Sequence, residues 1–444
     1  MNPGPNLAAT PAMDVADPAD MRRALFGKIA WRLMPFLFLC YLIAQVDRMN
    51  IAFAKLQMLD DLGFSELVYG MGAGVFFVGY VLFEVPSNLL MKRYGARRWI
   101  ARIMISWGAV SAGTLFVHTP AQFYTMRLLL GVAEAGFFPG IIYYLTDWFP
   151  RAWRTRMTAI FMTAIAVAGV TVGPVSGVIL HSMNGLHGLA GWQWLFVIEG
   201  VPSIVLGLAT LAWLPASPQQ ARFLSADEKA QVHALIEAER ATVRKVRVGQ
   251  VLARPLVWVF SAIYGCYGVS FFGFVFWLPT IIKVSGIKDP LAIGMLSTIP
   301  WCVAVVAMGF VARWVDRRQH TRTMLMVLSM LAALGWAASP LVASSVGLSM
   351  VVLSLAMFGL MASLPVFWNL PTAAWQGRAS AVAIALITSV GNLPGLFSPY
   401  LVGWIKTATH SMNGAMHMFS GVSLVGALLL AFVPDTPRRA SVAR

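Results

Sequence analysis

Hydrophobic and polar positions divide the chain into long apolar runs separated by short polar segments. Each run has about twenty or more residues, which is the length that an α-helix needs to cross a bilayer. We therefore expect twelve membrane-spanning helices and an all-α membrane protein. The predicted spans are 30–55, 66–91, 98–117, 121–146, 156–181, 192–215, 255–283, 291–312, 322–341, 346–370, 379–405 and 415–434.

The longest polar interruption, 216–253, has six predicted spans on either side. Inside it, Ser225 precedes Asp227 and Glu228, a pattern typical of a helix N-terminus, so we expect a helix that runs through Arg240. The basic segment after this helix should lie along the inner membrane surface. The expected organisation is a tail (1–28), an N-terminal bundle (29–215), a linker (216–253), a C-terminal bundle (254–434) and a second tail (435–444).

The two halves show traces of an internal repeat. Arg154 after the fourth span corresponds to Arg378 after the tenth at a shift of 224 positions, and basic loops follow the second and eighth spans near the same offset. Repeated halves related by pseudo-symmetry are a common way to build secondary transporters. The sequence therefore favours two pseudo-symmetric six-helix bundles, packed partly through small-residue patterns such as Gly70–Gly74 and Gly173–Gly177.

Composition and charge support a membrane protein. The chain is 58% hydrophobic and 11% charged, whereas soluble domains carry about a quarter charged residues. The net charge of +15 is concentrated in the terminal segments and in the loops after even-numbered spans. The opposite side holds little more than Lys55, Lys283, Lys288 and Lys406. This asymmetry predicts that both termini lie in the cytoplasm, and it argues against a nucleic-acid partner. We expect a multi-pass protein of the inner (plasma) membrane.

The sequence gives no indication of enzymatic chemistry. Cys40, Cys266 and Cys302 all fall inside predicted spans, where they are best interpreted as packing residues. We find no metal-ligand cluster, no nucleophile motif and no soluble domain large enough for a cofactor. We therefore expect no metal, no cofactor and no enzyme.

Four of the charged residues inside the apolar spans stand out. A charge near the bilayer centre costs about 2.5–3.5 kcal/mol on insertion scales, so these residues need a reason to be there. Asp47 and Arg48 lie about eight residues from the outer end of the first span, and Arg127 about six from that of the fourth, or roughly 10 Å deep in each case. Glu134 follows Arg127 by two helical turns. We expect an outer cluster of Asp47, Arg48 and Arg127, with Glu134 deeper.

These residue types suit the transport of an organic anion with protons. An arginine offers a two-pronged donor matched to a carboxylate, and a buried carboxyl group can gain or lose a proton. The alternative is that Asp47–Arg48 and Arg127–Glu134 are ion pairs that only tie the two spans together.

Several motifs make the chain resemble one family. The resemblance covers about residues 25–435 and rests on four segments: Val46-Asp47-Arg48-Met49-Asn50, Phe83-Glu84-Val85-Pro86-Ser87-Asn88, Arg127 through Glu134-Ala135-Gly136, and Gly391-Asn392-Leu393-Pro394-Gly395. Together they are similar to the anion:cation symporter family of the major facilitator superfamily. That resemblance implies carriage of organic anions such as tartrate, sugar acids, phthalate or hydroxyphenylacetate, commonly with protons.

The resemblance also implies roles for individual residues. Asp47 and Glu134 match proton-titrating carboxylates, Arg48 a substrate-binding arginine, and Arg127 an arginine coupled to the acid of the fourth span. Tyr80 and Asn392 match polar cavity residues. Trp368 and Asn369 are candidate substrate contacts, although the tryptophan could equally be a packing residue. Residues expected to act in the conformational loops are Glu84, Arg93, Arg97, Asp147, Arg154, Asp316 and Arg317, while Glu199 is expected to be structural.

We expect a monomeric carrier in the lipid bilayer that imports a small tartrate- or sugar-acid-like anion with protons by alternating access. Aromatic acids and anion exchange remain alternatives within transport. A non-transporting membrane sensor is the alternative from another class.

Overall fold

The computed structural model describes residues 18–241, 248–318, 320–375 and 377–433. The predicted C-terminal tail (435–444), most of the N-terminal tail and the basic segment 242–247 lie outside these residues. Within them, twelve helices or helix pairs are long and apolar enough to cross a membrane, from Met21–Leu62 to Asn413–Leu430. The predicted all-α architecture and number of spans are confirmed.

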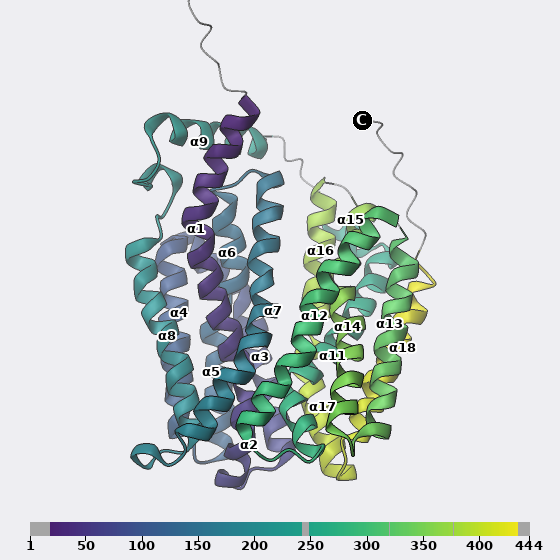
Figure 1. Ribbon diagram of the computed structural model, residues 1–444. Coiled ribbons are helices and arrows are strands. Elements are labelled where there is room, and N and C mark those ends of the chain that lie inside the picture. Colours follow the sequence, from purple (N-terminus) through teal and green to yellow (C-terminus); the bar gives the residue numbers. More distant parts are fainter. Residues whose placement is uncertain (1–17, 242–247, 319, 376, 434–444) are drawn as a thin grey trace, which may run out of the picture.

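The first six spans lie side by side in one half of the molecule (Figure 1). They begin with a long first span, in which α1 is continued by α2, and the fourth span is likewise divided between α5 and α6. The helices are α1 (Pro18–Met49), α2 (Ile51–Leu62), α3 (Glu66–Tyr94), α4 (Ala96–Gly113), α5 (Pro120–Glu134), α6 (Phe137–Thr146), α7 (Arg151–Ser182) and α8 (Gly191–Trp213).

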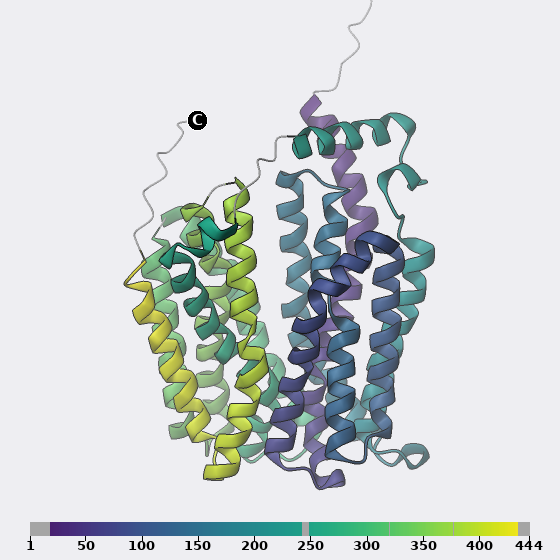
Figure 2. The same cartoon turned by 180° about the vertical axis from the view of Figure 1, so that it is seen from behind.

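The other six spans form the second half, and Figure 2 shows the same division from behind. The linker between the halves contains α9 (Ala226–Ala241) and α10 (Val248–Leu252). The predicted helix after Ser225 is therefore confirmed. The helices of the second half are α11 (Pro255–Val284), α12 (Pro290–Arg318), α13 (Thr321–Ala338), α14 (Val346–Phe367), α15 (Asn369–Ala374), α16 (Gly377–Asn392), α17 (Pro394–Thr409) and α18 (Asn413–Leu430).

The start of α1 and the linker helix α9 lie at one end of the molecule, which we call the terminal end (Figure 1). The opposite end, where α2 leads into α3, is called the far end. The halves contact each other through α3 with α17, α7 with α12, and α2 with α11. Their ribbons separate toward the terminal end in both views.

Glycines bring the two halves together at these contacts. A Cβ atom added to Gly74 of α3 would lie 2.2 Å from the carbonyl oxygen of Leu396, and one added to Gly173 of α7 would lie 2.4 Å from that of Gly294. No real side chain tolerates such approaches, so the helices meet backbone against backbone. The small-residue patterns at Gly70–Gly74 and Gly173–Gly177 are thus packing surfaces between the halves.

Candidate functional site

The sharpest interruption of a span follows Glu134, the last residue of α5. Ala135 is non-helical and Gly136 has a φ of +86°, a conformation that favours glycine. A Cβ atom at Gly136 would also lie 2.5 Å from Ser87 Oγ. The interruption therefore depends on glycine at this position, and it ends α5 at the carboxylate of Glu134.

Glu134 forms an ion pair with Arg48 of α1, through Oε1 and Nη2. The carboxylate is buried, whereas the side chain of Arg48 is 19% exposed. The guanidinium of Arg48 also lies 5.4 Å from the ring centroid of Phe76 and 5.3 Å from that of Tyr80, both on α3. Arg48 thus joins α1 to α5 and rests on an aromatic surface of α3.

Arg127 lies two turns before Glu134 on α5 and is 2% exposed. Its guanidinium is 5.1 Å from the ring centroid of Phe76, and its Nε donates to the carbonyl of Gly72 at 3.4 Å. Nη1 and Nη2 have no hydrogen-bond partner within the described part of the chain. Phe76 therefore contacts two guanidinium groups, one paired with a carboxylate and the other with free donors.

Close packing of α3 against α5 sets this arrangement. A Cβ atom at Gly131 would lie 2.0 Å from the carbonyl oxygen of Phe76, and one at Gly79 would lie 2.5 Å from that of Leu128. The two backbones therefore touch between Arg127 and Glu134. This contact brings the Phe76 ring within reach of both arginines.

Asp47 belongs to a different set of contacts. It is 3% exposed, and its Oδ1 accepts from Ser111 Oγ at 2.5 Å and from Asn50 Nδ2 at 3.0 Å. Its other oxygen, Oδ2, has no hydrogen-bond partner among the residues described. Asp47 therefore hydrogen-bonds to α4 and takes no direct part in the ion pair that its neighbour Arg48 makes.

These contacts correct the predicted depths. Arg127 lies within electrostatic range of Asp47 and Arg48, as expected of one charged cluster, but the expected separation of Glu134 from that cluster is not seen, because Arg48 pairs with Glu134 directly. A guanidinium lies several bonds from its Cα atom, so the depth of the backbone does not fix the depth of the charge. The alternative of Asp47–Arg48 and Arg127–Glu134 pairs also does not match the pairing seen.

Glu199 of α8 was not singled out by the sequence as part of the site, yet it lies close to Asp47. It is 5% exposed, its Oε1 accepts from Ser176 Oγ at 3.0 Å, and it lies within electrostatic range of Asp47. The polar network around Asp47 thus extends to α7 and α8. An acid in the middle of an apolar span was the available signal, but the span alone does not show which face it occupies.

The residues predicted from the second half form an aromatic group. The ring centroid of Trp368 is 5.0 Å from that of Tyr264 and 5.3 Å from that of Phe367. Tyr264 lies within electrostatic range of Tyr41 on α1, so this group faces the first half. Asn369 and Asn392 are exposed, at the junctions of α14 with α15 and of α16 with α17. None of these residues contacts Arg48 or Arg127 through an interaction seen in the described residues.

The predicted loop residues have varied environments. Glu84 is half-buried and lies within electrostatic range of Arg48, which connects it to the charged cluster as well as to its loop. Arg93 is exposed with its guanidinium 5.7 Å from the Tyr94 ring. Of the remaining residues, Arg97 and Asp147 are half-buried near Tyr144, Arg317 is exposed, and the side chain of Asp316 lies outside the described part.

Ion pairs within the described part of the chain bind the linker helix α9 to the first half. Arg154 of α7 pairs with Glu239 at 3.0 Å, and Lys28 of α1 pairs with Glu228 at 2.9 Å. Hydrogen bonding by Lys28, together with the backbone N–H of Ser225, lowers the pKa of Glu228. The sequence did not indicate that Arg154 connects its loop to the linker.

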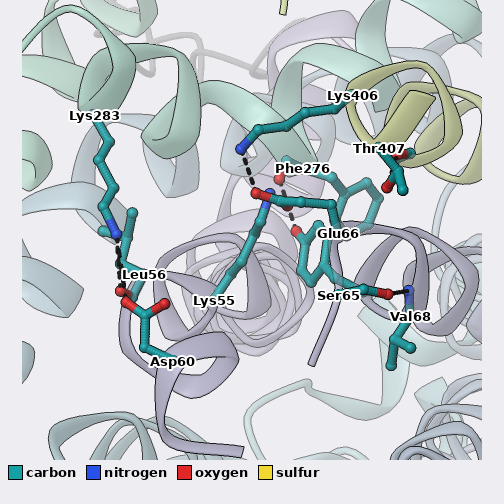
Figure 3. Close-up of polar contacts among 12 residues, drawn as sticks. Lys55, Leu56, Asp60, Ser65, Glu66, Val68, Phe276, Lys283, Lys406 and Thr407 are labelled. Atoms are coloured by element: carbon teal, nitrogen blue, oxygen red, sulfur yellow. Dashed lines mark hydrogen bonds and ion pairs between the residues drawn. The ribbon is translucent and has the colours of Figure 1, made fainter. Parts of the chain in front are cut away.

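A second charged group, which the sequence analysis missed, lies at the far end between the halves (Figure 3). Glu66 of α3 is 2.6 Å from Lys55 of α2 and also pairs with Lys406 of α17, while Lys283 of α11 is 3.8 Å from Asp60 of α2. Two of these ion pairs therefore join one half to the other. The signal was the scarcity of lysine on this side, which was interpreted only as topology.

Comparison with known proteins identifies the family of the chain. The model of the Major Facilitator Superfamily matches residues 37–399. The chain belongs to this superfamily. Membership in this superfamily confirms the prediction that the protein is a transporter and not an enzyme. The twelve apolar helices accordingly make it a multi-pass membrane protein.

Several relatives of this superfamily member match nearly its whole length. "Putative metabolite transport protein NicT" of Pseudomonas putida is 42% identical, with 93% of this chain and 95% of the relative covered. "Putative tartrate transporter" of Agrobacterium vitis is 42% identical over 94% and 96%. "Quinolone resistance transporter" of Acinetobacter baumannii is 37% identical over 93% and 96%.

Solved structures share the superfamily fold at low sequence identity. The crystal structure of a D-xylose-proton symporter matches with a TM-score of 0.73 and 15% identity, covering 91% of this chain and 98% of that one. At this identity the similarity establishes the fold alone.

Proposed function

We propose that this superfamily member is a secondary transporter that imports a small organic anion together with protons. The observation that carries the proposal is Arg127, a buried arginine whose two terminal nitrogens have no hydrogen-bond partner among the described residues. A buried cation with free donors is costly unless it binds an anion for part of its working cycle. The guanidinium fork suits a carboxylate.

The Arg48–Glu134 pair supplies a means of coupling. While Glu134 is ionised, it occupies Arg48. Once Glu134 takes up a proton, the pair is lost and Arg48 can bind the substrate carboxylate. Release of that proton restores the pair and expels the anion, so the anion and the proton travel together. Asp47, which lies near the same cluster without a direct cationic partner in the described residues, is proposed as a second proton site.

We further propose that the bundles 29–215 and 254–434 rock about this site while the linker 216–253 keeps them joined. We propose that the protein lies in the inner membrane with its terminal end in the cytoplasm. The concentration of Lys and Arg at that end supports this orientation. In that orientation the ion pairs at the far end hold the outer side closed. The chain is proposed to act as a monomer.

A tartrate- or sugar-acid-like substrate is our first choice, supported by the relative named as a tartrate transporter. A second candidate is an aromatic acid, which the group of Tyr264, Phe367 and Trp368 could stack upon. Thermal stabilisation by a panel of organic anions separates the two, because only a ligand that binds the folded protein raises its unfolding temperature.

Uptake by proteoliposomes tests the function itself. An inward proton gradient should drive accumulation of radiolabelled tartrate or of the best anion from the panel, and a protonophore should abolish it. An uptake rate unaffected by the protonophore would refute proton coupling. Absence of uptake and of counterflow for every anion tested would refute organic anion transport.

A further inference from the structure

A cavity of about 210 Å³ lies at the far end, between the two halves. Figure 3 shows the charged residues of its lining. It is lined from the first half by α2 and α3, and from the second by α11 and α17. It is smaller than the ~300–1,000 Å³ pockets that hold drug-sized ligands, so it suits an anion of a few heavy atoms. The polar residues of its lining are Lys55, Asp60, Glu66, Thr280, Lys283 and Lys406.

The lining carries more positive than negative groups. Three lysines face two carboxylates, which gives a formal charge of +1. Glu66 is shared, since it pairs with both Lys55 and Lys406, and the contact of Lys283 with Asp60 is long at 3.8 Å. One ammonium group is therefore left without a carboxylate of its own in this lining.

The buried part of the cavity lining holds a cation between aromatic rings and has a free donor. The Lys55 ammonium lies 3.4 Å from the ring centroid of Trp277 and 4.5 Å from that of Tyr69, so a buried cation is held between two aromatic rings. Thr280 is 4% exposed, and its hydroxyl has no hydrogen-bond partner in the described structure. At the mouth, the side chain of Lys283 is 42% exposed and reaches solvent.

We propose that this cavity is a second anion site, which binds a small carboxylate through Lys283, Lys406 and Thr280. The inference rests on the proposed function, because the ligand is the class of anion that the chain is proposed to carry. The site is separate from Arg127, which lies on α5, outside this lining. A carboxylate bound here competes with Glu66 for Lys406, and it thereby weakens an ion pair that holds the two halves together.

Binding of radiolabelled tartrate to the purified full-length protein tests the second site. Equilibrium dialysis would compare wild type with Arg127→Gln, Lys283→Gln and Lys283→Arg. Arg127→Gln should abolish uptake but still bind some tartrate, namely the component held at the second site. Lys283→Gln should weaken that component about threefold to fivefold, the effect of one partly exposed charge contact. Lys283→Arg keeps the charge and should bind as wild type does.

Lys288→Gln is the matched control, because Lys288 is an exposed lysine at the same end that does not line the cavity. It should leave the bound component unchanged. The second site is refuted if Arg127→Gln removes all bound tartrate, or if Lys283→Gln binds like wild type. If tartrate binding depends on Lys283 but the wild-type protein transports no anion, the second site is supported and the proposed function is refuted.

Discussion

At the scale of single residues, the two arginines beside Phe76, Arg48 and Arg127, differ in their hydrogen-bond and ion-pair partners. Arg48 is paired with Glu134, whereas Arg127 keeps free terminal donors in the described structure. On the proposed mechanism, the Arg48 guanidinium becomes available to substrate only when Glu134 is neutralised, whereas the Arg127 guanidinium already has free donors in this state. This difference assigns separate tasks to the two positions and can be tested by substitution.

Glu134→Gln should uncouple transport from the proton gradient. Each coupled proton supports about a tenfold accumulation per unit of pH, because one unit corresponds to about 1.4 kcal/mol. The variant cannot gain or lose a proton, so it should lose that accumulation while still exchanging internal for external anion. Counterflow and gradient-driven uptake in the same proteoliposomes measure both. An equal loss of the two would indicate a purely structural role for Glu134.

Arg127→Lys should weaken anion binding while preserving charge. Lysine offers a point charge in place of the planar fork, so we expect the loss of one charge-assisted hydrogen bond and about a tenfold lower affinity. The shift of unfolding temperature with anion concentration gives this affinity. Unchanged affinity would show that the anion does not contact Arg127.

The residue types of the site could be predicted from the sequence, because a charge within an apolar span is conspicuous. Their partners could not. Asp47 and Arg48 are neighbours, yet one points to Ser111 on α4 and the other to Glu134 on α5. Successive residues of a helix point about 100° apart, and the choice of partner depends on which helix packs on each side.

At the scale of helices, the site depends on the close approach of α3 and α5. The apolar runs predicted the helices, but not the interruption at Ala135–Gly136, which lies inside one continuous apolar run. Ala135 and Gly136 fit the apolar pattern of the span, so that pattern does not reveal the break. Its detection needs the backbone itself.

Gly131→Ala should push α3 away from α5. The added Cβ would lie 2.0 Å from the carbonyl oxygen of Phe76, and overpacking of this kind costs about 1–3 kcal/mol. We expect a lower unfolding temperature and slower uptake. Gly27→Ala is the matched control, since a Cβ there meets nothing within 4 Å. If both variants were equally stable, the α3–α5 contact would be adaptable.

Docking of α9 on α1 should weaken in acid. Because the pKa of Glu228 is lowered in the folded protein, its pair with Lys28 contributes above the ordinary carboxyl value of about 4.3, and that contribution is lost as the pH falls through the lowered value. The mobility of a spin label at position 230 of α9, in a background without native cysteines, should rise on acidification. Glu228→Gln should show high mobility at every pH; a wild-type-like response would contradict the assignment.

At the scale of the whole molecule, the halves are joined at the far end by both packing and charge. The sequence predicted two bundles from the linker and the repeat, but contacts between bundles cannot be read from either half alone. Glu66 pairs with Lys55 within the first half, but it pairs with Lys406 of the second half only when the halves meet. Their proximity is a property of one arrangement of the halves.

Lys406→Gln should shift the protein toward a more open far end. The substitution removes one of the ion pairs between the halves, and we expect a change of about threefold to fivefold in the equilibrium, as for a partly exposed pair. Distances between spin labels placed on α3 and α17 at the far end measure the fraction of molecules in which that end is open. Lys288→Gln should leave the distances as in wild type. A distribution for Lys406→Gln identical to wild type would show that packing alone holds the far end.

The glycine contact between α7 and α12 has a mechanical consequence. Gly173 and Gly294 touch through their backbones, and the side chain closest to Gly173 is the small hydroxyl group of Ser297, so we expect a change of angle there to meet little resistance. The contact can serve as a pivot with α7 as its lever. Arg151, at the other end of α7, lies 22 residues away (173 − 151), or roughly 33 Å of helix. A rotation of about 10° would move that end by about 6 Å on this geometry. Small changes in charge pairing near the pivot would therefore be amplified into large displacements at the terminal end.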